Sequence, residues 1–172
     1  MGRTPLMQAT GSVAEFLIAS GASLERKDND GDTPLMHATK RSDAELVTFY
    51  VEKGANLETK DNFGRTPLAL AADRKSYKMV KLLISLGSDV NSQGDTGMTP
   101  LMIVAFRGDV VIAAYLLSCG ADPLIKTTSI TYFRNWGSFS SGGFDTVINA
   151  KATALTIAKK NSNSAVIELL SE

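Results

Sequence analysis

The sequence predicts an all-α solenoid in which about five helix-turn-helix units stack and share one continuous core. A Thr-Pro-Leu motif returns every 33 residues, at Thr33, Thr66 and Thr99, and a glycine that ends each unit keeps the same interval. A fixed period of this length is typical of stacked repeats, which bury their apolar faces against their neighbours. The period breaks after Leu124, because a threonine due at position 132 stands at Thr153 and leaves 21 additional residues.

The central unit, which begins at Asp61, shows how each helix is delimited. Thr66 can cap a helix whose first residue is Pro67, since proline lacks the N–H that would be unpaired there. Residues 77–85 then carry apolar side chains at helical spacing, and Gly87 supplies the left-handed residue that commonly ends a helix. The unit is therefore a short helix, a polar break and a second helix.

The same pattern occurs in the units on both sides. The matching motifs are Asp28-x-x-Gly31-x-Thr33-Pro34-Leu35, Asp61-x-x-Gly64-x-Thr66-Pro67-Leu68 and Gly97-x-Thr99-Pro100-Leu101, together with Gly54-Ala55-Asn56, Gly87-Ser88-Asp89 and Gly120-Ala121-Asp122. With these motifs the chain resembles the ankyrin repeat family. The resemblance implies helix pairs joined by short β-turn fingers. The histidine that usually follows Thr-Pro-Leu in the family is replaced by Met36, Ala69 and Met102.

We expect a single domain over 1–172, with repeats over about 1–27, 28–60, 61–93, 94–126 and 148–172. The second helices of the three central repeats are predicted at Ala44–Glu52, Tyr77–Ser85 and Val110–Ser118. The first repeat is shorter than the others, and Ala154 replaces the motif's proline in the last. These two repeats are therefore expected to cap the array.

The insertion lies within 126–148 and is rich in aromatic residues, namely Tyr132, Phe133, Trp136, Phe139 and Phe144. Two strand-prone stretches, 127–133 and 144–148, flank a glycine- and serine-rich segment, so we expect an extended hairpin-like structure. Two interpretations of its aromatic residues remain open. They anchor a binding partner, or they form a flap that covers repeats four and five.

Composition excludes several classes of function. Lysine plus arginine and aspartate plus glutamate number 18 each, so the net charge is zero and does not favour nucleic-acid binding. No apolar run is long enough to span a membrane, and the first residues do not form a signal segment. The single cysteine, Cys119, has no second thiol to pair with. A free thiol fits a reducing compartment, so we expect a cytoplasmic protein.

The sequence offers no catalytic constellation. Its one histidine, His37, and its one cysteine, Cys119, lie 82 residues apart, and no phosphate-binding loop of the GxxxxGK type is present. A lone histidine is more often a packed or surface residue than a metal ligand. We therefore expect no enzyme activity, no metal site and no cofactor.

Three surfaces could bind a partner. The resemblance implies that partners meet the finger tips and the exposed ends of the first helices. At the tips Phe63, Arg65 and Met98 are expected to be exposed, and exposed apolar tips favour a protein interface. The insertion is a second surface.

The third surface is a column of arginines, Arg41, Arg74 and Arg107, which recur at intervals of 33 and have Lys40 and Phe106 beside them. Arginine binds carboxylate and phosphate groups through two parallel hydrogen bonds. The column therefore indicates an acidic or phosphorylated protein partner. A solvated cation that compensates the helix end is an equally good interpretation.

We therefore expect a non-enzymatic protein-binding module that acts as an adaptor or a steric inhibitor. The alternative is a sensor of an anion, a nucleotide or another small ligand, which would use the arginine column and the Gly142-Gly143 segment. The oligomeric state is left open at this point.

Overall fold

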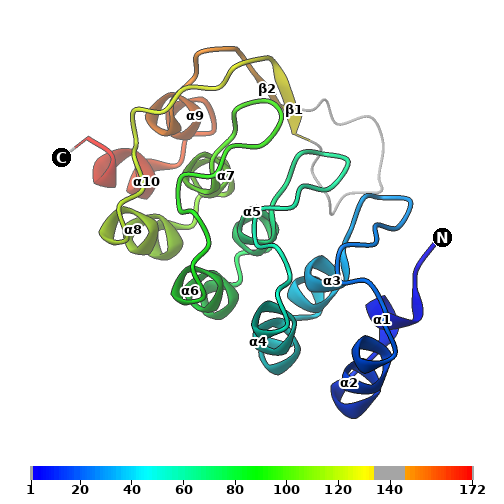
Figure 1. Cartoon of the computed structure of the whole chain (residues 1–172). Helices are drawn as coiled ribbons and strands as arrows, with labels where there is room; N and C mark the ends of the chain where they lie inside the picture. Colours follow the sequence, from blue (N-terminus) through cyan, green and yellow to red (C-terminus); the bar gives the residue numbers. More distant parts are fainter. Residues whose placement is uncertain (1, 134–145, 172) are drawn as a thin grey trace, which may run out of the picture.

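The computed structural model describes residues 2–133 and 146–171. Within these ranges the chain forms ten helices and one two-stranded sheet. The helices lie in two rows, with α1, α3, α5, α7 and α9 in the inner row and α2, α4, α6, α8 and α10 in the outer row (Figure 1). Their bounds are Pro5–Gln8 (α1), Gly11–Ala19 (α2), Pro34–Arg41 (α3), Ala44–Glu52 (α4), Pro67–Asp73 (α5), Tyr77–Ser85 (α6), Pro100–Arg107 (α7), Val110–Ser118 (α8), Ala154–Lys160 (α9) and Ser164–Leu169 (α10).

The second helices of the three central repeats confirm the predicted bounds, residue for residue. The predicted threonine caps are also confirmed. The side chains of Thr33, Thr66 and Thr99 each accept a hydrogen bond from the backbone N–H three residues on, and a proline follows each of them. Each such cap contributes about 1 kcal/mol to helix stability.

The glycines at the finger tips are required because successive fingers approach closely. A Cβ atom on Gly31 would lie 2.5 Å from the backbone nitrogen of Asn62, and one on Gly64 would lie 2.5 Å from that of Asp95. The fingers are also joined directly, since the Asn62 N–H donates to the Asp30 carbonyl over 3.0 Å. The regular spacing of glycine along this chain therefore allows the fingers to stack closely.

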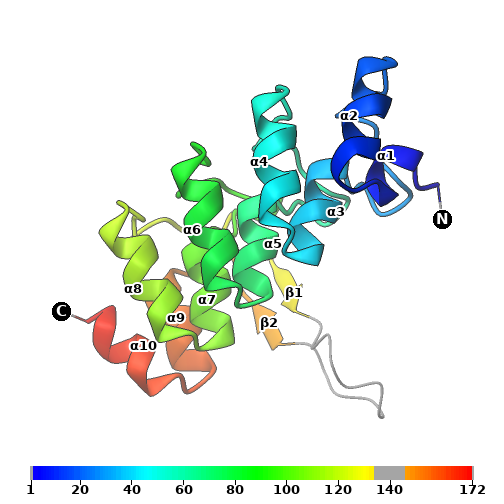
Figure 2. The ribbon, with the colours of Figure 1, turned by 90° about the horizontal axis from the view of Figure 1, so that it is seen from below.

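The buried apolar side chains form one continuous core, as the repeat period predicts. Figure 2 shows the two rows of helices from below. Leu68 and Leu83 of the central repeat are fully buried in this core. Tyr50 of α4 is also buried, and its hydroxyl donates to the Leu6 carbonyl over 2.8 Å, which ties the second repeat to the first. Burial raises the pKa of Tyr50 to about 12.

The insertion begins and ends on a short antiparallel pair of strands, β1 (Thr131–Phe133) and β2 (Thr146–Ile148). Tyr132 pairs with Val147, and the buried Thr127 closes the base, because its hydroxyl donates to the Asn149 carbonyl over 2.8 Å. Strand β1 begins four residues later than the first strand-prone stretch, 127–133. Three of the five aromatic residues lie outside the described residues, namely Trp136, Phe139 and Phe144.

No helix in the part of the chain that the structure describes is long and apolar enough to cross a membrane.

Candidate functional site

The concave side of the stack carries a groove of about 280 Å³ at the inner helices α3, α5 and α7. Its lining combines five cationic side chains, one carboxylate and one leucine, which are Lys40, Arg65, Arg74, Lys75, Arg107, Asp73 and Leu70. The chain as a whole has no net charge, so this excess of cations is local. An anionic group is the ligand that such a lining attracts.

Asp73, the last residue of α5, is the acidic centre of this groove. One of its carboxylate oxygens accepts from Arg107 at 2.8 Å (Nε) and 2.5 Å (Nη2), and the other lies 3.7 Å from Arg65. All three side chains are between 16% and 20% exposed. Because they are largely withdrawn from solvent, their attraction is screened less than that of a surface ion pair.

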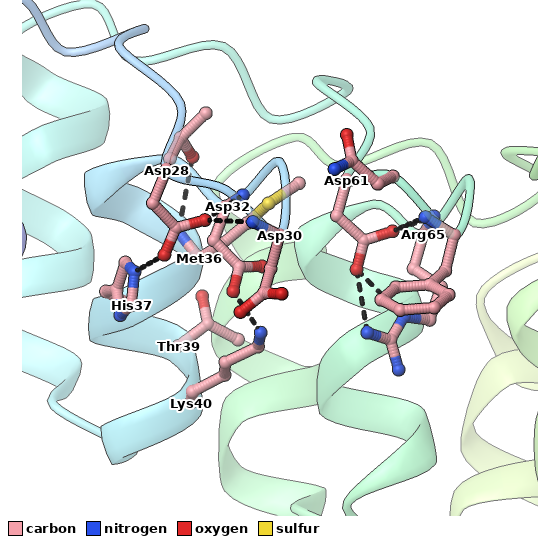
Figure 3. Close-up of polar contacts among 12 residues, drawn as sticks. Asp28, Asp30, Asp32, Met36, His37, Thr39, Lys40, Asp61 and Arg65 are labelled. Carbon is pink, nitrogen blue, oxygen red and sulfur yellow. Dashed lines mark hydrogen bonds and ion pairs between the residues drawn. The ribbon is translucent and has the colours of Figure 1, made fainter. Parts of the chain in front are cut away.

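Arg65 is held in place by an ion pair with Asp61, which is fully buried (Figure 3). The Asp61 carboxylate accepts from Arg65 at 2.9 Å (Nε) and 2.8 Å (Nη2), and its other oxygen accepts the backbone N–H groups of Phe63 and Arg65. The guanidinium also lies 4.9 Å from the centre of the Phe63 ring. Arg65 thus links the finger tip to the groove.

In the second repeat a buried aspartate also holds the finger in place, but its side-chain partner is a different residue (Figure 3). Asp28 accepts the backbone N–H groups of Asp30 and Asp32 at 2.9 Å, and its second oxygen lies 2.8 Å from Nε2 of His37. Burial of the Asp28 carboxyl opposes ionisation, but the hydrogen bonds from His37 and the two backbone groups outweigh it, and the pKa of Asp28 is lowered. His37 is packed, and it has an acidic partner that lies nine positions before it.

Asp28, Asp32 and His37 are also the residues, within the described ranges, that could hold a metal ion, since they bring ligand atoms within 4.8 Å of one another. Lys40 donates to the Asp32 carboxylate and already supplies a positive charge there. The cluster is therefore explained as a tie between the finger and α3.

The arginine column does not form the uniform row that its spacing predicts. Arg41 donates to the carbonyls of Met7 (2.7 Å) and Ala9 (3.4 Å) at the end of α1. Its positive charge therefore compensates the C-terminal end of a helix in the preceding repeat. Arg107 is paired with Asp73. Arg74 is exposed and makes no ion pair or side-chain hydrogen bond within the described residues.

The expectation that Met98 is exposed at a tip is wrong. Its side chain is only 6% exposed and belongs to the core. Met98 stands one residue before the helix cap, in register with Asp32 and Arg65, and none of these three side chains is exposed. Phe63 is confirmed as exposed, at 62%.

Phe106 stands beside the groove and packs partly against the core, with the Arg107 guanidinium 5.5 Å from its ring centre. The insertion reaches the same face at repeat five. There Lys160, which is in register with Phe106, donates to the Val147 carbonyl of β2. Tyr132 and Phe133 lie in β1, and the structure describes their backbone alone.

Reasoning from the sequence missed Asp73 and Lys75, which it treated as part of a polar break. A signal for Asp73 was present. Arg65 and Asp73 lie eight residues apart with opposite charges, and Asp32 and Lys40 repeat this spacing with the charges exchanged. Both spacings correspond to ion pairs in the structure.

A family model described as ankyrin repeats (3 copies) matches residues 10–94 and 40–127 of the chain. No curated protein gives a significant match.

Proposed function

The chain belongs to the ankyrin repeat family, and from this premise we propose that its groove binds an acidic or phosphorylated segment of a protein partner. Ankyrin repeats are generally non-enzymatic protein–protein interaction modules. In this proposal the chain acts by occupying the surface of its partner, as an adaptor or a steric inhibitor, and it does so in the cytoplasm.

One observation carries the proposal, namely the five cationic side chains against one carboxylate in the groove. Two of the cations, Arg65 and Arg107, are held by Asp61 and Asp73. Their guanidinium groups are therefore fixed before a partner arrives, which reduces the entropy that binding must overcome. Arg74 and Lys75 are exposed at the rim and are the cations that a partner's anion reaches first.

The neighbouring finger adds an apolar contact to this charge. Phe63 is exposed, and its ring lies against Arg65. Aromatic and arginine side chains are enriched among the residues that dominate binding energy. In the proposal the aromatic insertion adds a further contact, with β2 held at the groove position of repeat five by Lys160.

The test uses arrayed acidic and phosphorylated peptides, followed by titration of the best binder into the purified protein. Arg74→Glu is expected to weaken binding about tenfold or more and to reduce its salt dependence. Lys78→Glu is the matched control, because it makes the same charge change on the outer helix α6 and is expected to bind like the wild type. Equal binding by the wild type and Arg74→Glu would remove the groove from the interface.

A small anion is the second candidate for this groove, because its volume and its fixed guanidinium groups fit a phosphate as well as a side chain. A thermal-shift measurement with inorganic phosphate or a nucleotide separates the two. A free ligand at 100 times its Kd adds about 2.7 kcal/mol to the free energy of unfolding. The Gly142-Gly143 segment of the sensor hypothesis lies outside the described residues.

A further inference from the structure

Three of the five cations in the groove are already paired with carboxylates. The pairs are Lys40–Asp32, Arg65–Asp61 and Arg107–Asp73, of which Figure 3 shows the first two. Arg74 and Lys75 are exposed, and neither has a carboxylate within ion-pair distance among the residues that the structure describes. The groove therefore holds two positive charges that the chain itself does not neutralise.

Arg74 differs from the arginines at the same position in the neighbouring repeats. Arg41 donates to two carbonyls at the end of the preceding first helix, and Arg107 donates to the Asp73 carboxylate. Arg74 makes neither kind of contact within the described ranges, 2–133 and 146–171. The bonds that give the other two arginines a structural role do not account for Arg74, so its guanidinium is available to a ligand.

Lys75 stands where the backbone turns after the first helix of its repeat. Its φ of 55° lies in the left-handed region, and so do those of Ser42 (57°), Gly108 (73°) and Ser162 (55°), which hold the same position in other repeats. Side chains other than glycine adopt this conformation at a cost in free energy. Serine or glycine meets the requirement of the turn in three repeats, so the turn does not explain a lysine in the fourth.

We propose that the groove selects a dianionic phosphate group, carried by a phosphorylated side chain of the partner, over a single carboxylate. This inference rests on the proposed function and names which of its two anionic groups the groove prefers. A phosphorylated serine carries a charge of about −1.5 to −2 at pH 7, which matches the two unpaired cations, whereas a carboxylate carries a single charge. Because Coulomb attraction is proportional to the charge of the ligand, a phosphate gains about twice as much from Arg74 and Lys75.

The hydrogen-bond donors of the groove also suit a group with three oxygens. Arg107 uses Nε and Nη2 on one oxygen of Asp73, which leaves its third nitrogen, Nη1, without a hydrogen-bond partner in the described part of the chain. Arg74 and Lys75 bring further donors to the same groove. A phosphate group offers three acceptor oxygens to these three side chains, whereas a carboxylate offers two.

An apolar contact beside the groove favours a phosphate on a peptide over a free phosphate ion. Phe63 is 62% exposed, and its ring centre lies 4.9 Å from the Arg65 guanidinium that lines the groove. A free phosphate gains nothing from this ring. The residues that flank a phosphorylated side chain can pack against it, since exposed aromatic rings are enriched at protein interfaces.

The probe for the test is the tightest binder of the arrayed peptides, labelled with a fluorophore and synthesised with phosphoserine, glutamate or serine at its central anionic position. Fluorescence anisotropy with the full chain gives the Kd of each form. At pH 7 the phosphoserine form is expected to bind at least about tenfold more tightly than the glutamate form. A glutamate form that binds equally or more tightly overturns the preference for phosphate and leaves the proposed function standing. Failure of every arrayed peptide to bind removes the proposed function as well.

A pH titration tests whether the dianion is the bound form. A phosphate on serine has its second pKa near about 6, so it loses most of one charge between pH 7 and pH 5, whereas a glutamate carboxylate, with a pKa of about 4.3, stays ionised. The groove is lined by arginine and lysine side chains, one aspartate and one leucine, without a histidine. The phosphoserine form should therefore lose much of its advantage over the glutamate form at pH 5. The glutamate form reports any change in the protein itself, and an advantage that is unchanged at pH 5 overturns the dianion.

Lys75→Ser tests the unpaired cations. Serine stands at this position in repeats two and five with the same backbone conformation, so the variant is expected to fold, and circular dichroism checks this. It should weaken the phosphoserine form at least about fivefold and the glutamate form less. Lys78→Ser is the matched control, because it removes the same charge from the outer helix α6, outside the groove, and it should leave the preference unchanged.

Two further outcomes are decisive. A preference for phosphoserine that survives Lys75→Ser in full overturns the role of the unpaired cations. Displacement of the phosphoserine peptide by an equal concentration of inorganic phosphate would identify free phosphate as the ligand and overturn a phosphorylated partner. The expected result is that inorganic phosphate competes only in large excess, because it lacks the contact with Phe63.

Discussion

Arg107 of repeat four is bound to Asp73 of repeat three through two of its nitrogens, Nε at 2.8 Å and Nη2 at 2.5 Å from the same carboxylate oxygen. The pair joins the ends of α7 and α5, so it stabilises the stacking of adjacent repeats and at the same time neutralises part of the groove. These two roles have opposite consequences for stability and for binding.

Asp73→Asn is therefore expected to lower stability and to strengthen binding of an acidic peptide. The amide keeps the shape but removes the charge that pairs with Arg107 and Arg65, at a cost of about 1–2 kcal/mol for a partly exposed pair. Chemical denaturation measures the first effect, and peptide titration measures the second. A variant that binds the acidic peptide more weakly would show that the hold of Asp73 on Arg107 contributes more to binding than the charge of Asp73 takes away.

Leu68→Ala and Leu83→Ala are each expected to lower the free energy of unfolding by about 2–5 kcal/mol. Both side chains are fully buried between neighbouring repeats, so the cavity cannot be filled from one side alone. Phe63→Ala should cost far less, because the ring is mostly in solvent. Urea denaturation of the three variants gives the comparison, and a larger loss for Phe63→Ala would contradict the placement of the tip.

The stability of the protein should depend on pH through Asp28. Its pKa in the folded chain lies below the ordinary value of 3.8, so its contribution is complete above that value and is lost as the pH falls below it, through the folded pKa. Thermal unfolding of Asp28→Asn should accordingly show a weaker dependence on pH in this acidic range than the wild type. Parallel curves for the two proteins would mean that Asp28 ionises alike in the folded and unfolded chains.

Replacement of 129–145 by an Asn-Gly turn is expected to leave helicity and cooperative unfolding nearly unchanged. Lengthening a surface loop costs only about 0.6 kcal/mol per doubling, so the stack does not need the insertion for closure. If the aromatic residues anchor the partner, the replacement removes most of the affinity, and Trp136→Ala alone weakens binding by about 2 kcal/mol. Circular dichroism and peptide titration test both parts. If the replacement instead unfolds repeats four and five, the insertion is a structural flap that covers them.

Local signals were sufficient for most of the fold. The Thr-Pro pair determines where a first helix begins, since the cap and the missing N–H act within one turn, and the predicted second helices have the observed bounds. The resemblance to ankyrin repeats likewise implied the fingers. These features depend on residues that are close in the sequence, and the fixed period repeats them.

The site could be predicted only in part, because the partner of a charged side chain depends on the stacking of repeats. The spacing of 33 correctly placed Arg74 and Arg107 in the lining of one groove, but the column also included Arg41, which turns to the carbonyls at the end of α1. The three arginines have the same spacing, so the spacing does not show which of them binds a carbonyl, which a carboxylate and which is exposed. The choice between carbonyl, carboxylate and solvent is made by the neighbouring repeat.

Capping, periodicity and glycine turns are local, so the sequence alone predicts the repeat, its all-α class and the bounds of the second helices in the three central repeats. Which positions are exposed depends on how the repeats pack. Met98 and Phe63 both looked like apolar tips, yet only one of them lies in solvent. The same is true of Asp73, whose role exists because stacking brings Arg107 within hydrogen-bonding distance of it. Burial and charge pairing are set by contacts between residues distant in the sequence, and those contacts form only when the repeats pack together.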